Sequence, residues 1–170
     1  DLVLAVAKAH GLYSHVDAAW AGAAMICPEF RALWQGIELA DSLVFNPHKW
    51  LGVQFDCAAH FLRDPSDLVR TLAIRPEYLK THGTDGIINY SEWSIPLGRR
   101  FRALKLWFVL RTYGLEGLRD RLRNHVRWWV ALADRLRAHP GFQIVTEPVL
   151  SLFTFRLAGG DDARQQAFVN

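Results

Sequence analysis

Lys49 is the residue with the clearest potential for covalent chemistry in this sequence. It lies in the segment Asn46-Pro47-His48-Lys49-Trp50, directly after a short apolar stretch. A lysine that forms an imine with an aldehyde needs a fixed and partly dry site, because only its neutral amine attacks. Pro47 restricts Asn46 to an extended conformation. We therefore expect Lys49 to project from a turn with a rigid base.

Asp17 is the second residue whose position predicts chemistry. It follows residues 12–16, a short, apolar and β-prone stretch that is typical of a buried strand. A carboxylate there is costly unless it meets a cation or caps the segment from Ala18 onward. A protonated ring nitrogen would satisfy Asp17, and the pairing would keep that ring electron-withdrawing. Both the cation partner and the cap stay open at this point.

The elements that must position these residues are strands alternating with helices. The strands are expected at residues 12–16, 42–45 and 57–62, and the helices at 1–10, 28–35 and from Asp64 onward, with Asp64 as the N-cap. This alternation predicts a parallel α/β sheet. Residues 75–89 contain proline and glycines without a sustained period, which is typical of a mobile functional loop.

Long helices followed by strands characterise the rest of the chain. Gly114 is expected to separate two helices, and His139-Pro140-Gly141 to end the second. Strands are then predicted at residues 142–145 and 150–156. We expect a domain boundary within the long helix, near residues 115–130. Residues 1–120 would complete a large α/β domain, and residues 121–170 would start a smaller α+β domain.

Composition narrows the class of protein. The 170 residues are 51% hydrophobic and 22% charged, as in a globular fold. The net charge of +3 comes from basic residues that alternate with apolar ones on helices, so we expect no nucleic-acid partner. Cys27 and Cys57 show no metal-binding spacing and are predicted to be buried, reduced thiols, which suits the cytoplasm. No apolar run is long enough to predict a membrane segment.

Several ordered segments resemble the pyridoxal-dependent group II decarboxylases, and within that family most resemble the aromatic-L-amino-acid decarboxylases. The matching segments are His15-Val16-Asp17-Ala18-Ala19-Trp20-Ala21-Gly22, Asn46-Pro47-His48-Lys49-Trp50, Phe55-Asp56-Cys57, Pro76-Glu77-Tyr78-Leu79-Lys80 and Ile95-Pro96-Leu97-Gly98-Arg99-Arg100-Phe101-Arg102. They span most of residues 12–157. The separation of 32 residues between Asp17 and Lys49 (49 − 17) also suits the family. The resemblance implies a fold-type I PLP-transferase-like large domain with a mainly parallel sheet.

The same resemblance implies a role around pyridoxal 5'-phosphate (PLP) for each matched residue. Lys49 would hold PLP as the internal aldimine, Asp17 would pair with the pyridine nitrogen, and Ala19 would pack on the ring. The other implied contacts are His48 near the ring and the substrate carboxylate, Ser42 and Asn46 at or near the phosphate, Tyr78 as the residue that assists protonation of the α-carbon, Phe55 at the border of the substrate pocket, and Gly98 lining the site of a partner subunit. For His48, Tyr78, Phe55 and Ser42, a purely structural role is the alternative.

The implied reaction is loss of CO2 from an aromatic L-amino acid in a homodimer with shared active sites. Tyr78 favours plain decarboxylation, because related aldehyde synthases resemble this chain but carry phenylalanine there. Decarboxylation of glutamate or of a sulfinate also stays open, as does a non-catalytic homologue that acts only by dimerising. The chain begins and ends within apparent helices, so we expect a fragment whose phosphate cup and ring-stacking residue lie upstream. Which aromatic amino acid is used stays open, although Gly98 suggests room for an indole.

Overall fold

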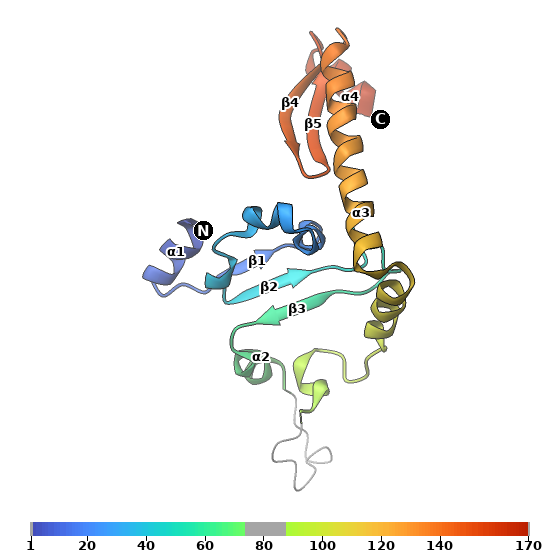
Figure 1. The fold of residues 1–170 in the computed structure, drawn as a ribbon. Helices are drawn as coiled ribbons and strands as arrows, with labels where there is room; N and C mark the ends of the chain where they lie inside the picture. Colours follow the sequence, from blue (N-terminus) through green and yellow to red (C-terminus); the bar gives the residue numbers. More distant parts are fainter. Residues whose placement is uncertain (1, 74–87, 170) are drawn as a thin grey trace, which may run out of the picture.

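The computed structural model describes residues 2–73 and 88–169 (Figure 1). A three-stranded sheet with short helices forms the amino-terminal part, and a long helix, α3, rises from it toward a two-stranded hairpin. The structure is mixed α/β, as the sequence predicted. None of the described helices is both long and apolar enough to cross a lipid bilayer.

The sheet contains β1 (His15–Asp17), β2 (Ser42–Phe45) and β3 (Ala59–Leu62), in that order. β1 runs parallel to β2, with Asp17 opposite Val44, whereas β3 runs antiparallel to β2. β3 is therefore the strand that departs from the parallel arrangement in a sheet predicted to be mainly parallel. Residues 46–58 form turns rather than a crossover helix, and a parallel return needs such a crossover. β1 is also shorter than expected, because its partner β2 begins opposite His15.

Short helices surround the sheet. They are α1 (Leu2–Ala9), the 3-10 helices η1 (Ala21–Ile26), η2 (Pro28–Trp34), η3 (Ile37–Leu39) and η5 (Tyr90–Trp93), and α2 (Pro65–Leu72). Asp64 caps α2 as predicted, because its carboxylate accepts a hydrogen bond of 2.9 Å from the Ser66 N–H. η1 packs on β2, and a Cβ at Gly22 would lie 3.0 Å from Cδ2 of Phe45. A larger residue at this position would therefore require the Phe45 ring to shift by a few tenths of an ångström.

Helix α3 (Arg102–Ala138) is two helical segments joined at Gly114, whose φ of 65° and ψ of 174° are not helical. The predicted break at Gly114 is thus confirmed. β4 (Phe142–Val149) and β5 (Leu152–Leu157) form an antiparallel hairpin beside the carboxyl-terminal part of α3, followed by α4 (Asp162–Val169). β4 is longer than predicted. The proposed domain boundary at residues 115–130 stays a prediction.

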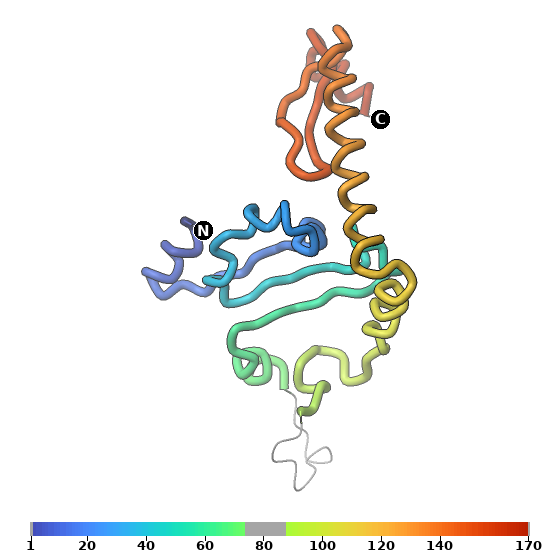
Figure 2. The backbone as a smooth tube through the Cα atoms, in the orientation of Figure 1, coloured from blue at the N-terminus to red at the C-terminus, as the bar shows by residue number. Residues whose placement is uncertain are grey.

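The hydrophobic core joins four parts of the chain that are distant in sequence. Its buried members are Ala23, Ala24, Cys27, Trp50, Leu51, Leu118, Leu122 and Leu150. They come from η1, the loop after β2, the second segment of α3 and the β4–β5 turn. Figure 2 shows the loop after β2 reaching the side of α3. The segment that carries Lys49 is therefore anchored in the core on one side.

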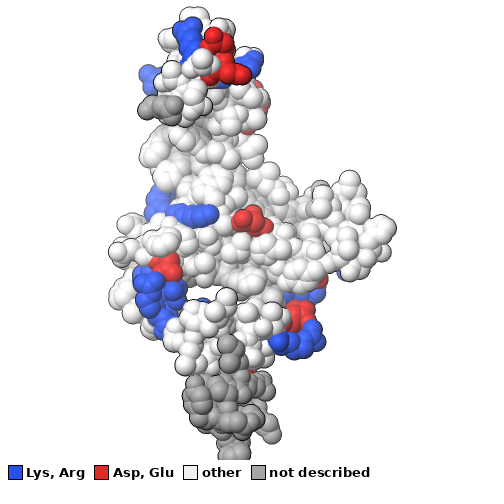
Figure 3. Space-filling model, turned by 180° about the vertical axis from the view of Figure 1, so that it is seen from behind, with Lys and Arg blue, Asp and Glu red and all other residues white. Residues whose placement is uncertain are grey.

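Charged side chains are distributed as ion pairs on helices and loops. Arg123 pairs with Glu29, Arg137 with Asp134, and Arg102 with Asp56. On the face shown in Figure 3, basic side chains form small separate groups, most of them near acidic ones, and much of the surface is uncharged. This distribution fits the predicted solvated helix faces.

We predict opposite effects for alanine at two glycines of α3. Gly114→Ala should destabilise the protein by about 1–3 kcal/mol, because its backbone conformation is essentially restricted to glycine. Gly117 lies within the helix, where an added Cβ would meet Tyr113 Cβ at an ordinary 3.6 Å. Gly117→Ala should be neutral or stabilise by up to about 1 kcal/mol. Urea unfolding of the full-length protein measures both, and equal effects would contradict the assigned break.

Candidate active site

The site is built where the parallel strands β1 and β2 end at the same edge of the sheet. Two backbone hydrogen bonds extend their pairing beyond the ladder. Ala18 N–H donates to the Val44 carbonyl over 3.0 Å, and Asn46 N–H donates to the Ala19 carbonyl over 2.9 Å. These bonds place the segment that starts at Asp17 directly beside the turn that carries Lys49. The structure therefore brings together the two backbone segments that the sequence singled out.

Asp17 takes one of the two roles that its sequence position left open, the cap, and its geometry is compatible with the other. Its Oδ1 accepts a hydrogen bond of 2.9 Å from the Ala19 N–H, so the side chain does cap the turn that follows β1. Oδ2 has no hydrogen-bond partner among the described residues, and the side chain is exposed. Ala18 and Ala19 behind it are buried. Asp17 is thus held in place by one oxygen and can offer the other to a cation.

The turn that carries Lys49 is rigid at its base. Lys49 N–H donates to the Asn46 carbonyl over 2.9 Å, and Val53 N–H donates to the Pro47 carbonyl over 3.0 Å. Pro47 is fully buried, as a rigid base requires. The Lys49 side chain itself is exposed. The described residues therefore fix its backbone but do not form the dry site that the sequence predicted, because they cover only one side of the turn.

His48 and Phe55 lie together beside Lys49. Nδ1 of His48 is 2.7 Å from the carbonyl oxygen and 2.9 Å from the amide nitrogen of Cys57, so the imidazole is held by backbone in either tautomer. Its Nε2 has no hydrogen-bond partner among the described residues and can bind a ligand. The Phe55 ring stands edge-on to the imidazole at 4.8 Å and is 79% exposed. Phe55 is therefore not a core residue in this part of the protein.

A network of charges holds the loop that carries Phe55. The Asp56 carboxylate accepts hydrogen bonds from Arg100 (2.6 Å) and Arg102 (2.9 Å), and Lys105 Nζ donates to the Asp56 carbonyl over 2.8 Å. The bond from Arg102 is the main reason that the pKa of Asp56 lies below its usual value. Cys57 beside it is buried, and burial raises the pKa of its thiol. Both cysteines are free and buried, as predicted.

The remaining predicted site residues do not all lie at the edge of the sheet that carries Lys49. Ser42 is 3% exposed at the other end of β2 from the Lys49 turn, and its hydroxyl lies 2.6 Å from Nδ1 of His15. Oδ1 of Asn46 is buried without a hydrogen-bond partner among the described residues. Gly98 lies in an exposed segment, with open space where its Cβ would be. Tyr78 lies outside the described residues.

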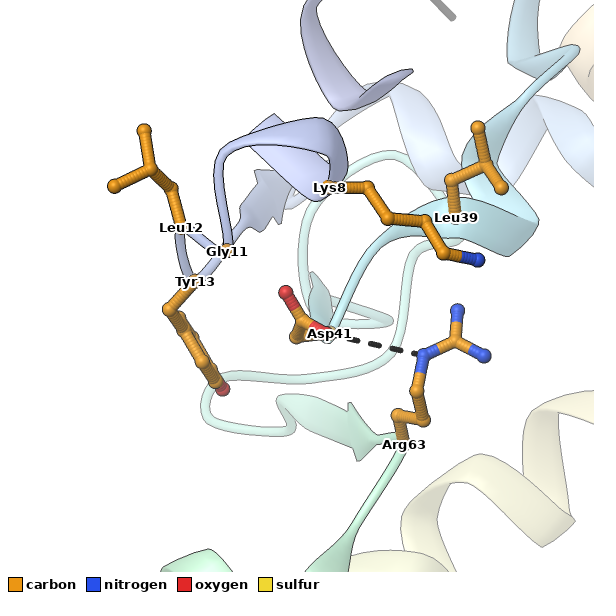
Figure 4. Close-up of a pocket in the computed structure, with 7 residues that line it drawn as sticks. All are labelled: Lys8, Gly11, Leu12, Tyr13, Leu39, Asp41 and Arg63. Atoms are coloured by element: carbon orange, nitrogen blue, oxygen red, sulfur yellow. Dashed lines mark ion pairs between the residues drawn. The ribbon is translucent and has the colours of Figure 1, made fainter. Parts of the chain in front are cut away.

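A surface pocket lies at the opposite end of the strands. Figure 4 shows its lining, which is Lys8, Gly11, Leu12, Tyr13, Leu39, Asp41 and Arg63. Asp41 Oδ1 is 3.9 Å from Arg63 Nε, and hydrogen bonds from the backbone and hydroxyl of Ser14 lower the pKa of Asp41. None of the predicted site residues that the structure describes lines this pocket, so it is separate from the Lys49 edge.

Sequence reasoning assigned no role to His125, although the structure connects it to the Lys49 turn. The indole of Trp50 donates a hydrogen bond of 2.9 Å to Nδ1 of His125. The signal was present in the spacing: Leu118, Leu122 and His125 follow one another at i+4 and i+3, which is the buried face of α3. A polar residue that continues a buried stripe must find a partner.

The groups at this edge fit PLP by their chemistry. Lys49 supplies an amine for an aldehyde, Asp17 an oxygen for a ring cation, and Ala19 a small buried surface. The buried Asn46 amide has an unfilled hydrogen bond, and rotation of that amide exchanges an acceptor for a donor. An anionic group such as a phosphate would accept such a bond.

Comparison with known proteins identifies the family. Residues 2–158 match the pyridoxal-dependent decarboxylase conserved domain. The chain is 46% identical over 162 residues to the aromatic-L-amino-acid decarboxylase of Rattus norvegicus, covering 94% of this chain and 34% of that protein. The chain thus spans about a third of the length of the curated relatives it matches.

Solved structures agree with this match. The structure of Oryza sativa TDC with PLP and tryptamine is similar at a TM-score of 0.85 and 40% identity, covering 91% of this chain and 32% of that one. The 4-hydroxyphenylacetaldehyde synthase of Rhodiola rosea is similar at 0.83 and 34% identity, covering 97% and 33%. The conserved domain, the identities and the arrangement of Asp17 and Lys49 lead to one conclusion: this chain belongs to the pyridoxal-dependent decarboxylase family.

Proposed function

We propose that the complete protein removes CO2 from an aromatic L-amino acid, with PLP carried on Lys49. One observation carries this proposal: the hydrogen bond from Asn46 N–H to the Ala19 carbonyl joins the Lys49 turn to the segment that begins at Asp17. An amine and a carboxylate are thereby held at one edge of the sheet. This is the pair of groups that an aldehyde on a basic ring requires.

When bound, PLP supplies an electron sink for the bond that breaks at the substrate α-carbon. The residues of this chain would serve that chemistry in distinct ways. Oδ2 of Asp17 holds a proton on the ring nitrogen, and the buried Ala19 lets the ring approach closely. Nε2 of His48 binds the substrate carboxylate, and Asn46 donates to the phosphate. Ser42 lies at the other end of β2 from the Lys49 turn and its hydroxyl is paired with His15, so we expect it to support the strands rather than to bind the phosphate.

The proton that replaces CO2 on the α-carbon needs a donor. We propose the phenol of Tyr78 for this role, because a phenol is a neutral acid that can give its proton to the α-carbon, and the phenolate that remains regains a proton from solvent. A phenylalanine at position 78 would leave the α-carbon open to oxidation by dissolved O2 instead. An aromatic aldehyde synthase is therefore the second candidate, and the similarity to the Rhodiola rosea enzyme favours keeping it.

The aromatic substrate class is supported by the names of the relatives. The Rattus norvegicus relative is an aromatic-L-amino-acid decarboxylase, and the Oryza sativa TDC structure contains tryptamine. The exposed ring of Phe55 beside His48 offers an apolar face for an aromatic side chain. Gly98 is exposed, and a Cβ there would meet no described atom within 4 Å, which suits a position that completes the site of the second subunit in a homodimer.

The cofactor assignment predicts a spectroscopic result. The full-length protein should absorb at about 420 nm, a value typical of the protonated linkage between PLP and a lysine. Lys49→Ala should abolish this band, because no other amine lies in the turn. Lys8→Ala, on α1 at the opposite end of the strands, is the matched control and should retain it. An unchanged spectrum in Lys49→Ala would refute the assignment.

Tyr78→Phe should change the products. We expect a shift from amine toward aldehyde, ammonia and hydrogen peroxide, with CO2 released in both reactions, dissolved O2 as the oxidant, and binding of PLP retained. Chromatography of the products, together with a peroxide assay, measures the ratio. If Tyr78→Phe releases amine alone at the wild-type ratio, Tyr78 is not the group that decides between the two reactions.

A substrate panel tests the aromatic class. Release of CO2 from tyrosine, dopa, tryptophan and phenylalanine should exceed release from glutamate by at least about 100-fold in kcat/KM, because the site would have to desolvate a second carboxylate without a partner. A preference for glutamate or a sulfinate would overturn the aromatic assignment and leave the PLP assignment intact.

A further inference from the structure

We infer that Trp50 and His125 are a positioning pair that sets the geometry of the Lys49 turn for cofactor binding. This inference rests on the proposed function, because it concerns the use of Lys49 by PLP. Neither residue is expected to touch the reacting atoms. Each acts through the backbone of the turn that presents Lys49.

Trp50 follows Lys49 directly and is only 7% exposed. Its indole stacks on Trp20, with ring centroids 4.5 Å apart and an interplanar angle of 13°. Trp20 in turn follows Ala19 directly. The stack therefore links Trp50, which follows Lys49, to Trp20, which follows the alanine proposed to pack on the cofactor. It sets the separation between Lys49 and the segment of Asp17, which is the space that the pyridine ring must fill.

The indole N–H fixes the orientation of this stack. It donates to Nδ1 of His125 over 2.9 Å, so Nδ1 must be unprotonated and accept. His125 is half-buried on α3, and burial, with a smaller contribution from the Arg121 charge, lowers its pKa. The imidazole thus stays a neutral acceptor near neutral pH. Without this bond the indole could slide or rotate on Trp20, and the Lys49 turn with it.

Arg121 lies one helical turn before His125 on α3 and holds the backbone of the loop that carries Lys49. Its Nη2 donates to the Trp50 carbonyl over 2.7 Å. Gly52 makes this approach feasible, since a Cβ there would lie 2.8 Å from Cζ of the guanidinium and closer still to its terminal nitrogens. Gly52 also has a φ of 77°. Arg121 and His125 thereby hold the backbone and the side chain of one residue, Trp50, from one helix face.

A double-mutant cycle in the full-length protein tests the pair. Trp50→Phe keeps an aromatic ring against Trp20 but loses the donor, and His125→Phe keeps the volume but loses the acceptor. Titration of the apoenzyme with PLP, followed by absorption at about 420 nm, gives the Kd. Each single change should weaken PLP binding by roughly 3- to 10-fold, the range expected for one hydrogen bond. The double variant should bind no worse than the weaker single variant.

Rescue and control variants separate positioning from general destabilisation. His125→Asn places a neutral amide oxygen where Nδ1 lay, and it should keep the Kd within about twofold. Trp129→Phe makes the same chemical change as Trp50→Phe, but at a tryptophan on α3 that contacts Phe153. It should leave the Kd for PLP unchanged. Thermal melting of each apoenzyme reports stability independently of the cofactor.

Several results would overturn the inference. The first is a loss of PLP affinity in the double variant equal to the product of the two single losses. The second is a loss in Trp129→Phe as large as that in Trp50→Phe. The third is a lower melting temperature of the Trp50 and His125 variants with an unchanged Kd for PLP. They are distinguishable from failure of the proposed function. If the wild-type protein binds no PLP at Lys49, the proposed function falls and this inference with it. If it binds PLP and the cycle shows no coupling, only the positioning pair is refuted.

Discussion

The parallel pairing of β1 with β2 is the constraint on which the site depends. Parallel strands end at the same edge of a sheet, so whatever follows them must meet there. Here the pairing continues past the ladder, through the bonds of Ala18 N–H to Val44 and of Asn46 N–H to Ala19. Were the register shifted by one residue, Asp17 would point to the other face of the sheet. The alignment of the carboxylate with the lysine turn is thus a property of strand register.

Helix α3 supplies the contacts that hold the Lys49 turn in place, which the sheet alone does not provide. A turn after a strand has few backbone bonds of its own, and the role proposed for Lys49 requires a base that does not move. Leu118 and Leu122 bury the Lys49 loop against the helix, and residues on the next turns bind Trp50. The break at Gly114 turns the second segment of α3 so that it can rise past the loop (Figure 1).

Much of this architecture was predictable because its signals are local. The cap at Asp64, the break at Gly114 and the strand before Asn46 each depend on residue types within a few positions. The direction of β3 was not predictable from periodicity, since a strand of four residues looks the same in either direction. The length of β1 was also missed, because a strand extends only as far as its partner does.

The same distinction between local signals and tertiary contacts applies to the candidate site. The sequence by itself determined the chemical groups, because Lys49, Asp17 and His48 occur in ordered motifs with characteristic spacing. Only the tertiary structure decided that His125, 75 residues from Trp50, accepts a hydrogen bond from the indole N–H. The physical reason is that a sequence pattern records which face of a helix is buried, whereas a hydrogen bond depends on which distant residue is packed against that face.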